Sequence, residues 1–404
     1  MKLHLIRLKS KEELAQAAAM AGASAASLPF FEGRREALQL FIKDLPAPAA
    51  NIVKQEALAR NCDALVHAQT ITCGVEYTDV ILFGTARSLR FLADKLEKMP
   101  WWGLELCAAE IKRLTGGFSE RKVKLPCGSE LTFGRGTLIM GIINLTDDSF
   151  FAASRSGSDC EKAALTAVRM AEEGADILDL GAESTRPGAP RVSREQESER
   201  LVKAVCAIRE KLPHIPLSID TTRSQVAREA LAAGADIIND VSGLSFDPET
   251  AAAAAQYHAM LAVMHMRGTP ADMQSHCSYT NLISEVCGFL EESAAKAMAA
   301  GVPHDMLITD PGIGFAKNCE QNLMLLRHCE SFRALGWPVL IGASRKGFIG
   351  AVTETKTAAE RLAGTVAVTA LCTAQNADII RVHDVRPNKE AVMMTEAIWR
   401  GSYA

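Results

Sequence analysis

The sequence predicts an α/β fold, a (β/α)8 barrel preceded by a smaller mixed α/β domain, and three observations support that prediction. After about residue 120, eight short apolar segments alternate with helical segments, which is the order of a parallel α/β barrel. The apolar segments are continuous, as expected of strands that are buried on both faces. Polar residues follow each of them, and the active sites of such barrels lie at the carboxyl ends of the strands.

The composition indicates a globular protein with room for two domains. The chain has 404 residues, of which 48% are hydrophobic, enough for a large core. Its net charge of −4 predicts no general attraction to nucleic acid or to an anionic membrane. No segment is long and apolar enough to span a bilayer. Eleven scattered cysteines without a CxxC pair predict free thiols in a reducing compartment, so we expect a cytoplasmic protein.

Residues 1–120 are expected to form a small mixed α/β domain, whose role the sequence does not indicate. Its predicted helices lie at 11–21, 52–60, 86–98 and 104–114, and its predicted strands at 63–67 and 78–83. Pro46-Ala47-Pro48 is expected to form a turn or a short linker. The pattern of residues in this domain suggests no catalytic site.

Residues 121–404 are predicted to form the barrel, a TIM barrel that opens with a β-hairpin. Residues 121–135 alternate polar and apolar around Cys127-Gly128-Ser129, which is typical of a hairpin with glycine in its turn. The predicted strands lie at 138–143, 176–180, 216–219, 236–238, 260–264, 306–308, 338–341 and 378–382. The predicted helices lie at 159–173, 193–211, 223–233, 248–258, 281–300, 320–333, 357–375 and 389–399. An open doubly wound sheet is the alternative, but the glycine-rich GxGxxG turn typical of that fold is absent.

Three polar residues that end predicted strands are candidates for binding a flat heterocycle. Asp220, Asn239 and Asp310 follow three different strands, so a barrel would bring them to one mouth. Their carboxylates and amide can satisfy both donors and acceptors on the edge of a heterocyclic ring. The alternative is that each side chain only caps the helix that follows it.

A second group of residues is a candidate phosphate site. Arg381 and His383 are two residues apart on the last strand, so their side chains share one face. They should lie beside the 342–347 loop, which contains Lys346, where such barrels often bind phosphate. Asn144, at the end of the first strand, could bind Mg²⁺ through its side-chain oxygen. Simple exposure of Arg381 and Lys346 to solvent is the alternative.

The motifs of residues 138–395 resemble those of the dihydropteroate synthase family and occur in the family's order. They are the segments 140–144 (MGIIN), 179–188 (DLGAESTRPG), 218–221 (SIDT), 234–243 (GADIINDVSG), 264–270 (MHMRGTP), 310–315 (DPGIGF), 344–346 (SRK) and 381–384 (RVHD). One such motif would be weak evidence, but eight spread across the barrel are specific.

The resemblance implies a reaction and a set of residue roles. The reaction is the condensation of 7,8-dihydropterin-CH₂-pyrophosphate with 4-aminobenzoate, which gives 7,8-dihydropteroate and pyrophosphate in folate biosynthesis and uses Mg²⁺. The implied pterin-binding residues are Asp220, Asn239, Asp310, Phe315, Gly342 and Lys346. The implied pyrophosphate-binding residues are Asn144, which also binds the metal, Arg381 and His383. The implied aminobenzoate loop contains Ser184, Thr185, Arg186 and Pro187. Of all these, the residues expected to be catalytic are Asp310, Lys346, Arg381 and His383. A homodimer is also implied.

The chain departs from the family pattern in the loop after the first strand. The family has N-x-T-P-D-S-F-S-D-G-G there, whereas Asp147 replaces its proline and Ala152 replaces its second aspartate, a functional residue of the family. Gly347 stands where a serine usually follows Ser-Arg-Lys. Two alternatives therefore stay open, a pterin-dependent methyltransferase on the same barrel and a non-catalytic pterin-binding paralogue.

Overall fold

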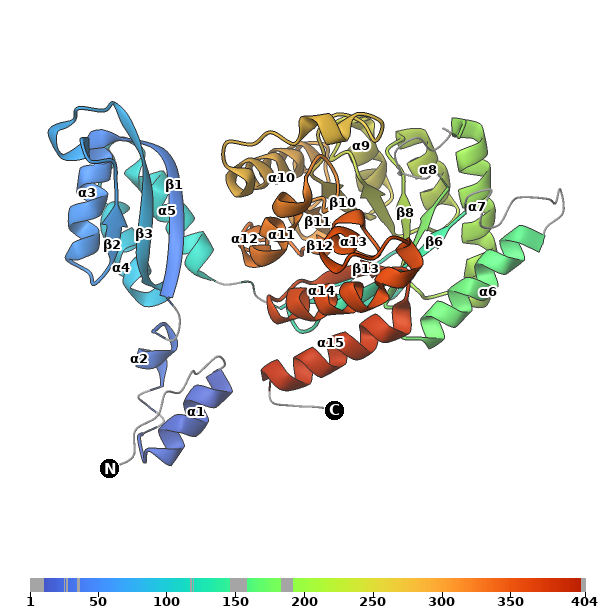
Figure 1. The fold of residues 1–404 in the computed structure, drawn as a ribbon, viewed down its shortest axis with the longest axis horizontal. Helices are drawn as coiled ribbons and strands as arrows, with labels where there is room; N and C mark the ends of the chain where they lie inside the picture. Colours follow the sequence, from blue (N-terminus) through green and yellow to red (C-terminus); the bar gives the residue numbers. More distant parts are fainter. Residues whose placement is uncertain are drawn as a thin grey trace. The chain divides into compact units, whose positions relative to one another are not determined.

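The structure is a computed structural model that describes residues 11–24, 26, 28–34, 37–116, 118, 120–145, 158–182 and 192–400. The chain divides into two compact units, Met1–Gly117 and Phe118–Ala404 (Figure 1). Within the described ranges, no helix has both the length and the apolar character needed to cross a membrane.

The N-terminal unit is a three-stranded antiparallel sheet with helices packed on it. The strands lie in the order β1-β3-β2 and are β1 (Ala37–Pro46), β2 (Asp63–Leu65) and β3 (Tyr77–Thr85). The helices are α1 (Lys11–Met20), α2 (Pro29–Glu32), α3 (Ala47–Leu58), α4 (Ala86–Leu96) and α5 (Leu104–Gly116). Val53 of α3, Leu82 of β3 and Leu89 of α4 are fully buried in one cluster, so this unit has its own core.

Three features of the N-terminal unit differ from the prediction, and one of them is the short helix α2, which was not predicted. Pro46-Ala47-Pro48 is not a linker, because helix α3 begins at Ala47. Proline is tolerated in the first helical turn, where its missing N–H would have no partner within the helix. Strand β1 was not predicted, although Leu38, Leu40 and Ile42 alternate with more exposed residues along it. The other predicted helices and strands of this unit are confirmed at similar bounds.

A β-hairpin covers the amino end of the barrel, and the predicted hairpin is thereby confirmed. Its strands are β4 (Arg121–Lys124) and β5 (Glu130–Phe133), which pair antiparallel. Leu131 and Phe133 of the hairpin are buried in one cluster with Met140 and Ile177, which belong to the first two barrel strands. The hairpin therefore excludes water from the end of the barrel opposite to the predicted site.

Eight parallel strands form the barrel that the sequence predicted (Figure 1). They are β6 (Leu138–Asn144), β7 (Ile177–Gly181), β8 (Leu217–Asp220), β9 (Ile237–Asp240), β10 (Met260–Met264), β11 (Leu307–Asp310), β12 (Leu340–Ile341) and β13 (Ile379–Val382). Each strand pairs with its neighbour in the order β11-β10-β9-β8-β7-β6-β13-β12. A parallel bridge between Thr309 and Val339 joins the two ends of this series and closes the barrel.

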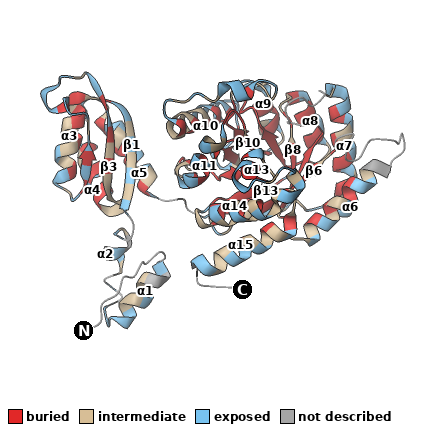
Figure 2. Cartoon of the chain, viewed as in Figure 1, coloured by how far each residue is buried: buried red, intermediate tan, exposed pale blue. Residues whose placement is uncertain are grey.

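Helices surround the barrel, with their buried faces toward the strands and their other faces exposed (Figure 2). They are α6 (Ser158–Glu172), α7 (Arg194–Lys211), α8 (Ser224–Ala232), α9 (Glu249–Gln256), α10 (Leu282–Ala299), α11 (Cys319–Arg327), α12 (Cys329–Arg333), α13 (Gly347–Thr353), α14 (Leu362–Ala374) and α15 (Val385–Arg400). The prediction missed α13, and the single helix expected at 320–333 is two helices that meet at His328. The last helix begins at Val385, four residues before its predicted start.

Three aspartates each join a pair of adjacent barrel strands at their amino ends, and all three do so in the same way. Asp176, Asp236 and Asp378 directly precede β7, β9 and β13. Each accepts a hydrogen bond from a backbone N–H at the start of the preceding strand: Asp176 from Ile139 of β6 (2.8 Å), Asp236 from Leu217 of β8 (2.9 Å), and Asp378 from Val339, the residue directly before β12 (3.0 Å). Each also pairs with a basic side chain, contributed by Lys389, Arg209 and Arg333 in the same order. These bonds fix the strand register without involving polar groups at the carboxyl end of the barrel.

We expect Asp236→Ala to destabilise the barrel by about 3–5 kcal/mol. The Asp236 side chain is fully buried, and its loss leaves Arg209 and the N–H groups of Cys127 and Leu217 without their acceptor. Urea unfolding of the full chain measures the change. Lys203→Ala is the control, because Lys203 and its partner Glu199 are exposed, and its effect should stay within about 0.5 kcal/mol. Equal midpoints for the two variants would contradict this account.

Candidate active site

The polar residues predicted at the strand ends do converge at the carboxyl mouth of the barrel. Asp220 and Asp310 are the last residues of β8 and β11, Asn239 lies in β9, and Arg381 lies in β13. All four are at most partly exposed, because side chains at these positions point into the barrel. The alternative for Asp220, that it only caps a helix, is wrong: the N-cap of α8 is Arg223, and the first N–H of this helix, that of Ser224, donates to Asp247.

The Arg381 guanidinium joins three strands at the floor of the site. Its Nε donates to Oδ2 of Asp179 at 2.6 Å, and its Nη2 donates to Oδ2 of Asp220 at 2.8 Å. Asn239 also donates to Oδ2 of Asp179, at 3.4 Å. The third nitrogen of Arg381, Nη1, makes no hydrogen bond with the described residues. Arg381 is therefore held in place and still has a donor for a ligand, rather than being exposed to solvent.

Asp179 is a site residue that the sequence analysis did not single out. It is fully buried in β7, and its Oδ1 makes no hydrogen bond with the described residues. Its signal in the sequence was a carboxylate in the middle of an apolar strand, at a position that faces into the barrel. Such a carboxylate needs a partner, and Arg381 supplies it.

Burial shifts the pKa values of several ionisable groups in the site. Burial raises the pKa of the Asp220 carboxyl, Arg381 opposes the rise and Asp179 adds to it, which places this pKa at about 7. Burial also raises the pKa of Asp310, although Lys346 opposes that rise. Burial lowers the pKa of Lys346 to about 8, against the effect of Asp310. A ligand that supplies hydrogen bonds here can therefore change protonation states near neutral pH.

Lys346 and Gly342 bound an open space beside Asp310. Lys346 donates through Nζ to the carbonyl of Ile313 and lies 4.7 Å from the centroid of the Phe315 ring. A Cβ atom built on Gly342 would lie 4.0 Å from each of three groups, Oδ2 of Asp310, Nζ of Lys346 and Cδ of Arg381. Glycine at this position leaves room between a carboxylate, an ammonium and a guanidinium, which is the environment expected around a polar ring.

His383 and Asn144 lie at the ends of two adjacent strands, β13 and β6. Nδ1 of His383 is 3.0 Å from Oγ of Ser344, which also accepts from the backbone N–H of His383 at 3.2 Å. The Asn144 amide is partly exposed and makes no hydrogen bond with the described residues. Arg345 is paired with Asp384 by two bonds, of 2.9 and 2.6 Å, and is thereby occupied.

The residues present fit a magnesium ion that has few protein ligands and takes the others from phosphate oxygens and water. Across the described part of the chain, no three His, Cys, Asp or Glu residues form a cluster that could hold a metal. The Asn144 side chain offers one hard oxygen donor with no competing partner there. Mg²⁺ commonly takes one or two protein ligands and completes its shell with phosphate oxygens and water. A single side-chain oxygen is compatible with such an ion.

Some predicted residues lie outside the described ranges. These are Ser184, Thr185, Arg186 and Pro187 of the expected aminobenzoate loop, and Asp147 and Ala152 of the loop in which the chain departs from its family pattern.

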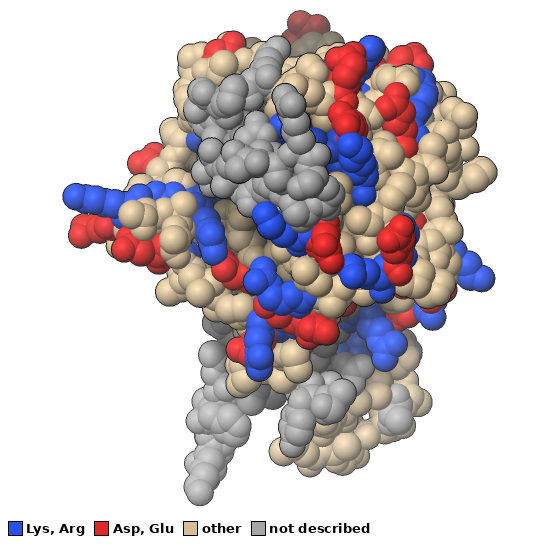
Figure 3. Space-filling view, turned by 90° about the vertical axis from the view of Figure 1, so that its right-hand side faces the viewer, with Lys and Arg blue, Asp and Glu red and all other residues tan. Residues whose placement is uncertain are grey.

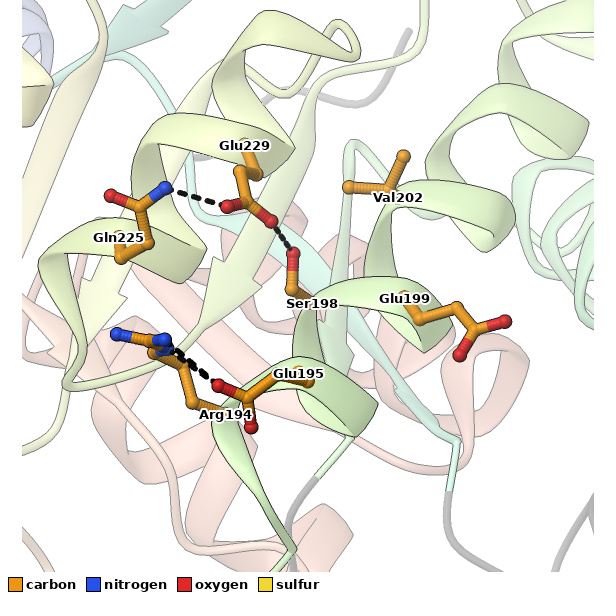
Figure 4. Close-up of a pocket in the computed structure, with 7 residues that line it drawn as sticks. All are labelled: Arg194, Glu195, Ser198, Glu199, Val202, Gln225 and Glu229. Atoms are coloured by element: carbon orange, nitrogen blue, oxygen red, sulfur yellow. Dashed lines mark hydrogen bonds and ion pairs between the residues drawn. The ribbon is translucent and has the colours of Figure 1, made fainter.

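A separate hollow of about 390 Å³ lies between α7 and α8, away from the strand ends (Figure 4). Its walls carry Glu195, Glu199 and Glu229, with Arg194 paired to Glu195, and Ser198 and Gln225 bonded to Glu229. Because its polar groups pair with one another, it lacks the free donors of the barrel mouth. On the face shown in Figure 3, acidic and basic side chains are interspersed.

The chain matches the family model described as pterin binding enzyme over residues 140–383. This match spans more than half of the chain. The chain belongs to the pterin binding enzyme family. It is 45% identical over 277 residues to a dihydropteroate synthase of Synechocystis, an alignment that covers 68% of this chain and 95% of that protein. A solved dihydropteroate synthase of Xanthomonas albilineans with 4-aminobenzoic acid has a TM-score of 0.63 and 39% identity, and the match covers 69% of this chain and 98% of that one.

A further relative matches the N-terminal unit as well. A probable bifunctional folylpolyglutamate synthase/dihydropteroate synthase of Halobacterium salinarum is 37% identical over 356 residues, which cover 88% of this chain and 42% of that protein. The unit Phe118–Ala404 is shorter than this span, so the match extends into the N-terminal unit. The similarity therefore reaches beyond the barrel motifs from which the resemblance was first drawn.

We expect Gly342→Val to weaken pterin binding by at least about tenfold, or about 1.4 kcal/mol, with little loss of stability. The added methyl groups would enter the space between Asp310, Lys346 and Arg381 without meeting an atom closer than 4.0 Å at Cβ. Calorimetric titration with a pterin and a thermal unfolding curve measure the two effects.

The matched control is Gly288→Ala on helix α10, where a Cβ would meet nothing within 4 Å. It should leave pterin binding unchanged and stabilise the helix by up to about 1 kcal/mol. Undiminished binding by Gly342→Val would show that the pterin lies elsewhere.

Proposed function

We propose that this chain is a dihydropteroate synthase of folate biosynthesis. It condenses 7,8-dihydropterin-CH₂-pyrophosphate with 4-aminobenzoate and releases 7,8-dihydropteroate and pyrophosphate. The observation that supports this most directly is the open space beside Gly342, bounded by Asp310, Lys346 and Arg381. Membership of the pterin binding enzyme family and 45% identity to a dihydropteroate synthase support the same reaction.

The pterin is proposed to bind at the floor of the barrel mouth. Asp220 and Asp310 would accept hydrogen bonds from its ring N–H groups, while Asn239 and Lys346 would donate to its ring acceptors. The Phe315 ring, 4.7 Å from the Lys346 ammonium, would cover one face of the heterocycle. The carboxylates are buried, so a ring without matching N–H donors would leave them without hydrogen bonds. This energetic cost would discriminate against such a ring in favour of the pterin.

The pyrophosphate is proposed to lie at the side of the mouth formed by β6 and β13. Nη1 of Arg381 and the imidazole of His383 would neutralise its charge, because Arg381 keeps this donor free of the described residues. Asn144 would hold a Mg²⁺ ion that pairs with the pyrophosphate oxygens and makes the pyrophosphate a better leaving group.

The reaction breaks the bond between the pterin methylene carbon and a pyrophosphate oxygen, and the electron pair leaves with the pyrophosphate. The amino nitrogen of 4-aminobenzoate forms the new bond to that carbon and gives up one proton, which the departing pyrophosphate or solvent water takes up. Arg381 and His383 stabilise the negative charge as it develops, and Asp310 tunes the protonation of the ring that supports the electron-poor methylene. The arylamine needs positioning more than it needs a strong base. Ser184, Thr185, Arg186 and Pro187 are proposed to supply part of that positioning.

The proposal includes a cytoplasmic homodimer that uses the last helix. Met393, Met394 and Ile398 of α15 are each more than 60% exposed, and Trp399 is 42% exposed. A second copy of the chain would cover this apolar surface.

A pyrophosphate-release assay on the full chain tests the proposed function. We expect release that requires both 7,8-dihydropterin-CH₂-pyrophosphate and 4-aminobenzoate and that rises with added Mg²⁺. Methyl transfer to a corrinoid would instead support the methyltransferase alternative. Tight pterin binding without turnover would support the non-catalytic alternative, and Ala152→Asp should then create activity.

The pH profile should reflect the titration of Asp220. Its pKa is raised to about 7. Protonation would replace one of its two acceptor oxygens by an O–H donor and remove the match to the ring N–H groups. We therefore expect kcat/KM for the pterin substrate to fall as the pH decreases through about 7, because this ratio reports groups of the free enzyme. Steady-state rates between about pH 5 and 9 measure the profile.

Asp220→Asn is the companion variant, because it replaces one acceptor by a donor and cannot titrate. It should lose most of its pterin affinity at every pH and lack the decrease centred near pH 7. An unchanged acid limb in this variant would assign the titration to another group.

A further inference from the structure

Lys317 is a buried lysine behind the candidate site, in the loop between β11 and α11. It is 2% exposed. Its Nζ donates to Nδ1 of His265 at 2.8 Å, to the carbonyl of Phe315 at 2.9 Å and to the carbonyl of His265 at 3.5 Å. Three acceptors match the three N–H bonds of an ammonium, so this charge is fully satisfied inside the protein.

The two loops that Lys317 joins are in direct backbone contact. Gly312 has φ +71°, and a Cβ atom there would lie 2.0 Å from the carbonyl oxygen of His265. Only glycine allows this approach. The backbone N–H of the same Gly312 donates to Oδ1 of Asp310 at 2.7 Å. The loop after β10 thus supports the turn that orients the Asp310 carboxylate, and Lys317 bonds to both loops beside this contact.

The charges around Lys317 are consistent with this arrangement. Burial, with Lys317 and Arg267 acting in the same direction, lowers the pKa of His265 to about 2, so the imidazole is neutral and Nδ1 can accept from Lys317. Burial lowers the pKa of Lys317 to about 7, and Asp310 opposes that change, while Lys346 and Arg267 add to it. Asp310 and Lys317 therefore stabilise each other's charged forms from opposite sides of the Gly312 turn.

We propose that Lys317 is a positioning residue for the pterin: its ammonium fastens the loop after β11 to the loop after β10 and so holds the Asp310 carboxylate and the Phe315 ring in place around Lys346. Lys317 touches no substrate and acts through the Phe315 carbonyl, the His265 side chain and the Gly312 turn. This inference rests on the proposed function, because it assigns a role within the same site.

Lys317→Met and Lys317→Gln in the full chain test the proposal. Methionine keeps the volume and removes every donor, so we expect KM for the pterin substrate to rise by at least about tenfold, with KM for 4-aminobenzoate nearly unchanged. Glutamine keeps an N–H donor for the Phe315 carbonyl and should recover part of the loss. A lysine that only packs would lower the thermal midpoint and affect both substrates equally, and that result would overturn the proposal.

Lys389→Met is the matched control. It too removes a paired lysine, but Lys389 is only partly buried and lies at the amino end of the barrel, 2.9 Å from Asp176. It should reduce stability without separating the two KM values. A split between the two KM values in this control as large as in Lys317→Met would overturn the proposal.

His265→Phe keeps the proposal testable if both Lys317 variants fail to fold. It removes one acceptor, retains the ring beside Phe289 (centroids 4.9 Å apart) and leaves the ammonium two backbone acceptors. A smaller rise in KM for the pterin supports the proposal, and an unchanged KM contradicts it. Calorimetric titration with the pterin pyrophosphate alone distinguishes a failure of this inference from a failure of the proposed function. If the proposed function fails, the wild-type chain binds the pterin but releases no pyrophosphate.

Discussion

The site depends on one buried interaction, the Arg381 guanidinium between the carboxylates of Asp179 and Asp220. A buried charge is costly unless it is paired, so each of the three groups needs the others. The pairing joins β7, β8 and β13 at the depth where the ring is proposed to bind. It also shapes the electrostatics: burial raises the pKa of Asp220 to about 7, although Arg381 opposes the rise and Asp179 adds to it. Arg381 is thus a structural partner that keeps one donor, Nη1, which the described residues do not use.

The two ends of the barrel use their polar groups in opposite ways. At the amino end, Asp236 and Asp378 are buried, and their oxygens accept from backbone N–H groups and arginines. At the carboxyl end, Asn144 and Nη1 of Arg381 keep hydrogen-bonding capacity that the described residues do not use. One end therefore stabilises the fold, and the other is available for chemistry. This separation explains how the site can hold several charges close together without losing the barrel.

The barrel and most of the candidate site were predictable from the sequence, for a simple geometric reason. Parallel strands in a closed barrel have all their carboxyl ends at one mouth, so Asp220, Asn239 and Asp310 had to meet once the alternation of strands and helices was recognised. Asp179 and Lys317 could not be assigned in this way. Their roles depend on partners 202 and 52 residues away in the chain, and nothing local to either residue names the partner. Strand β1 was not predicted, although its apolar residues alternate with more exposed ones, so the local pattern and the tertiary structure agree there.

The three aspartates at the amino end also bear on how the chain assembles. Each binds the strand directly before its own, across only 37, 19 and 39 residues. In each case a residue with positive φ, namely Gly174, Gly234 or Asn376, ends the intervening helix and a buried alanine precedes the aspartate. Strand pairing is therefore secured within short stretches of sequence, where the entropy of loop closure is small. Neighbouring strands can acquire their register as soon as both have left the ribosome, and closure by β12 and β13 joins segments that are already aligned.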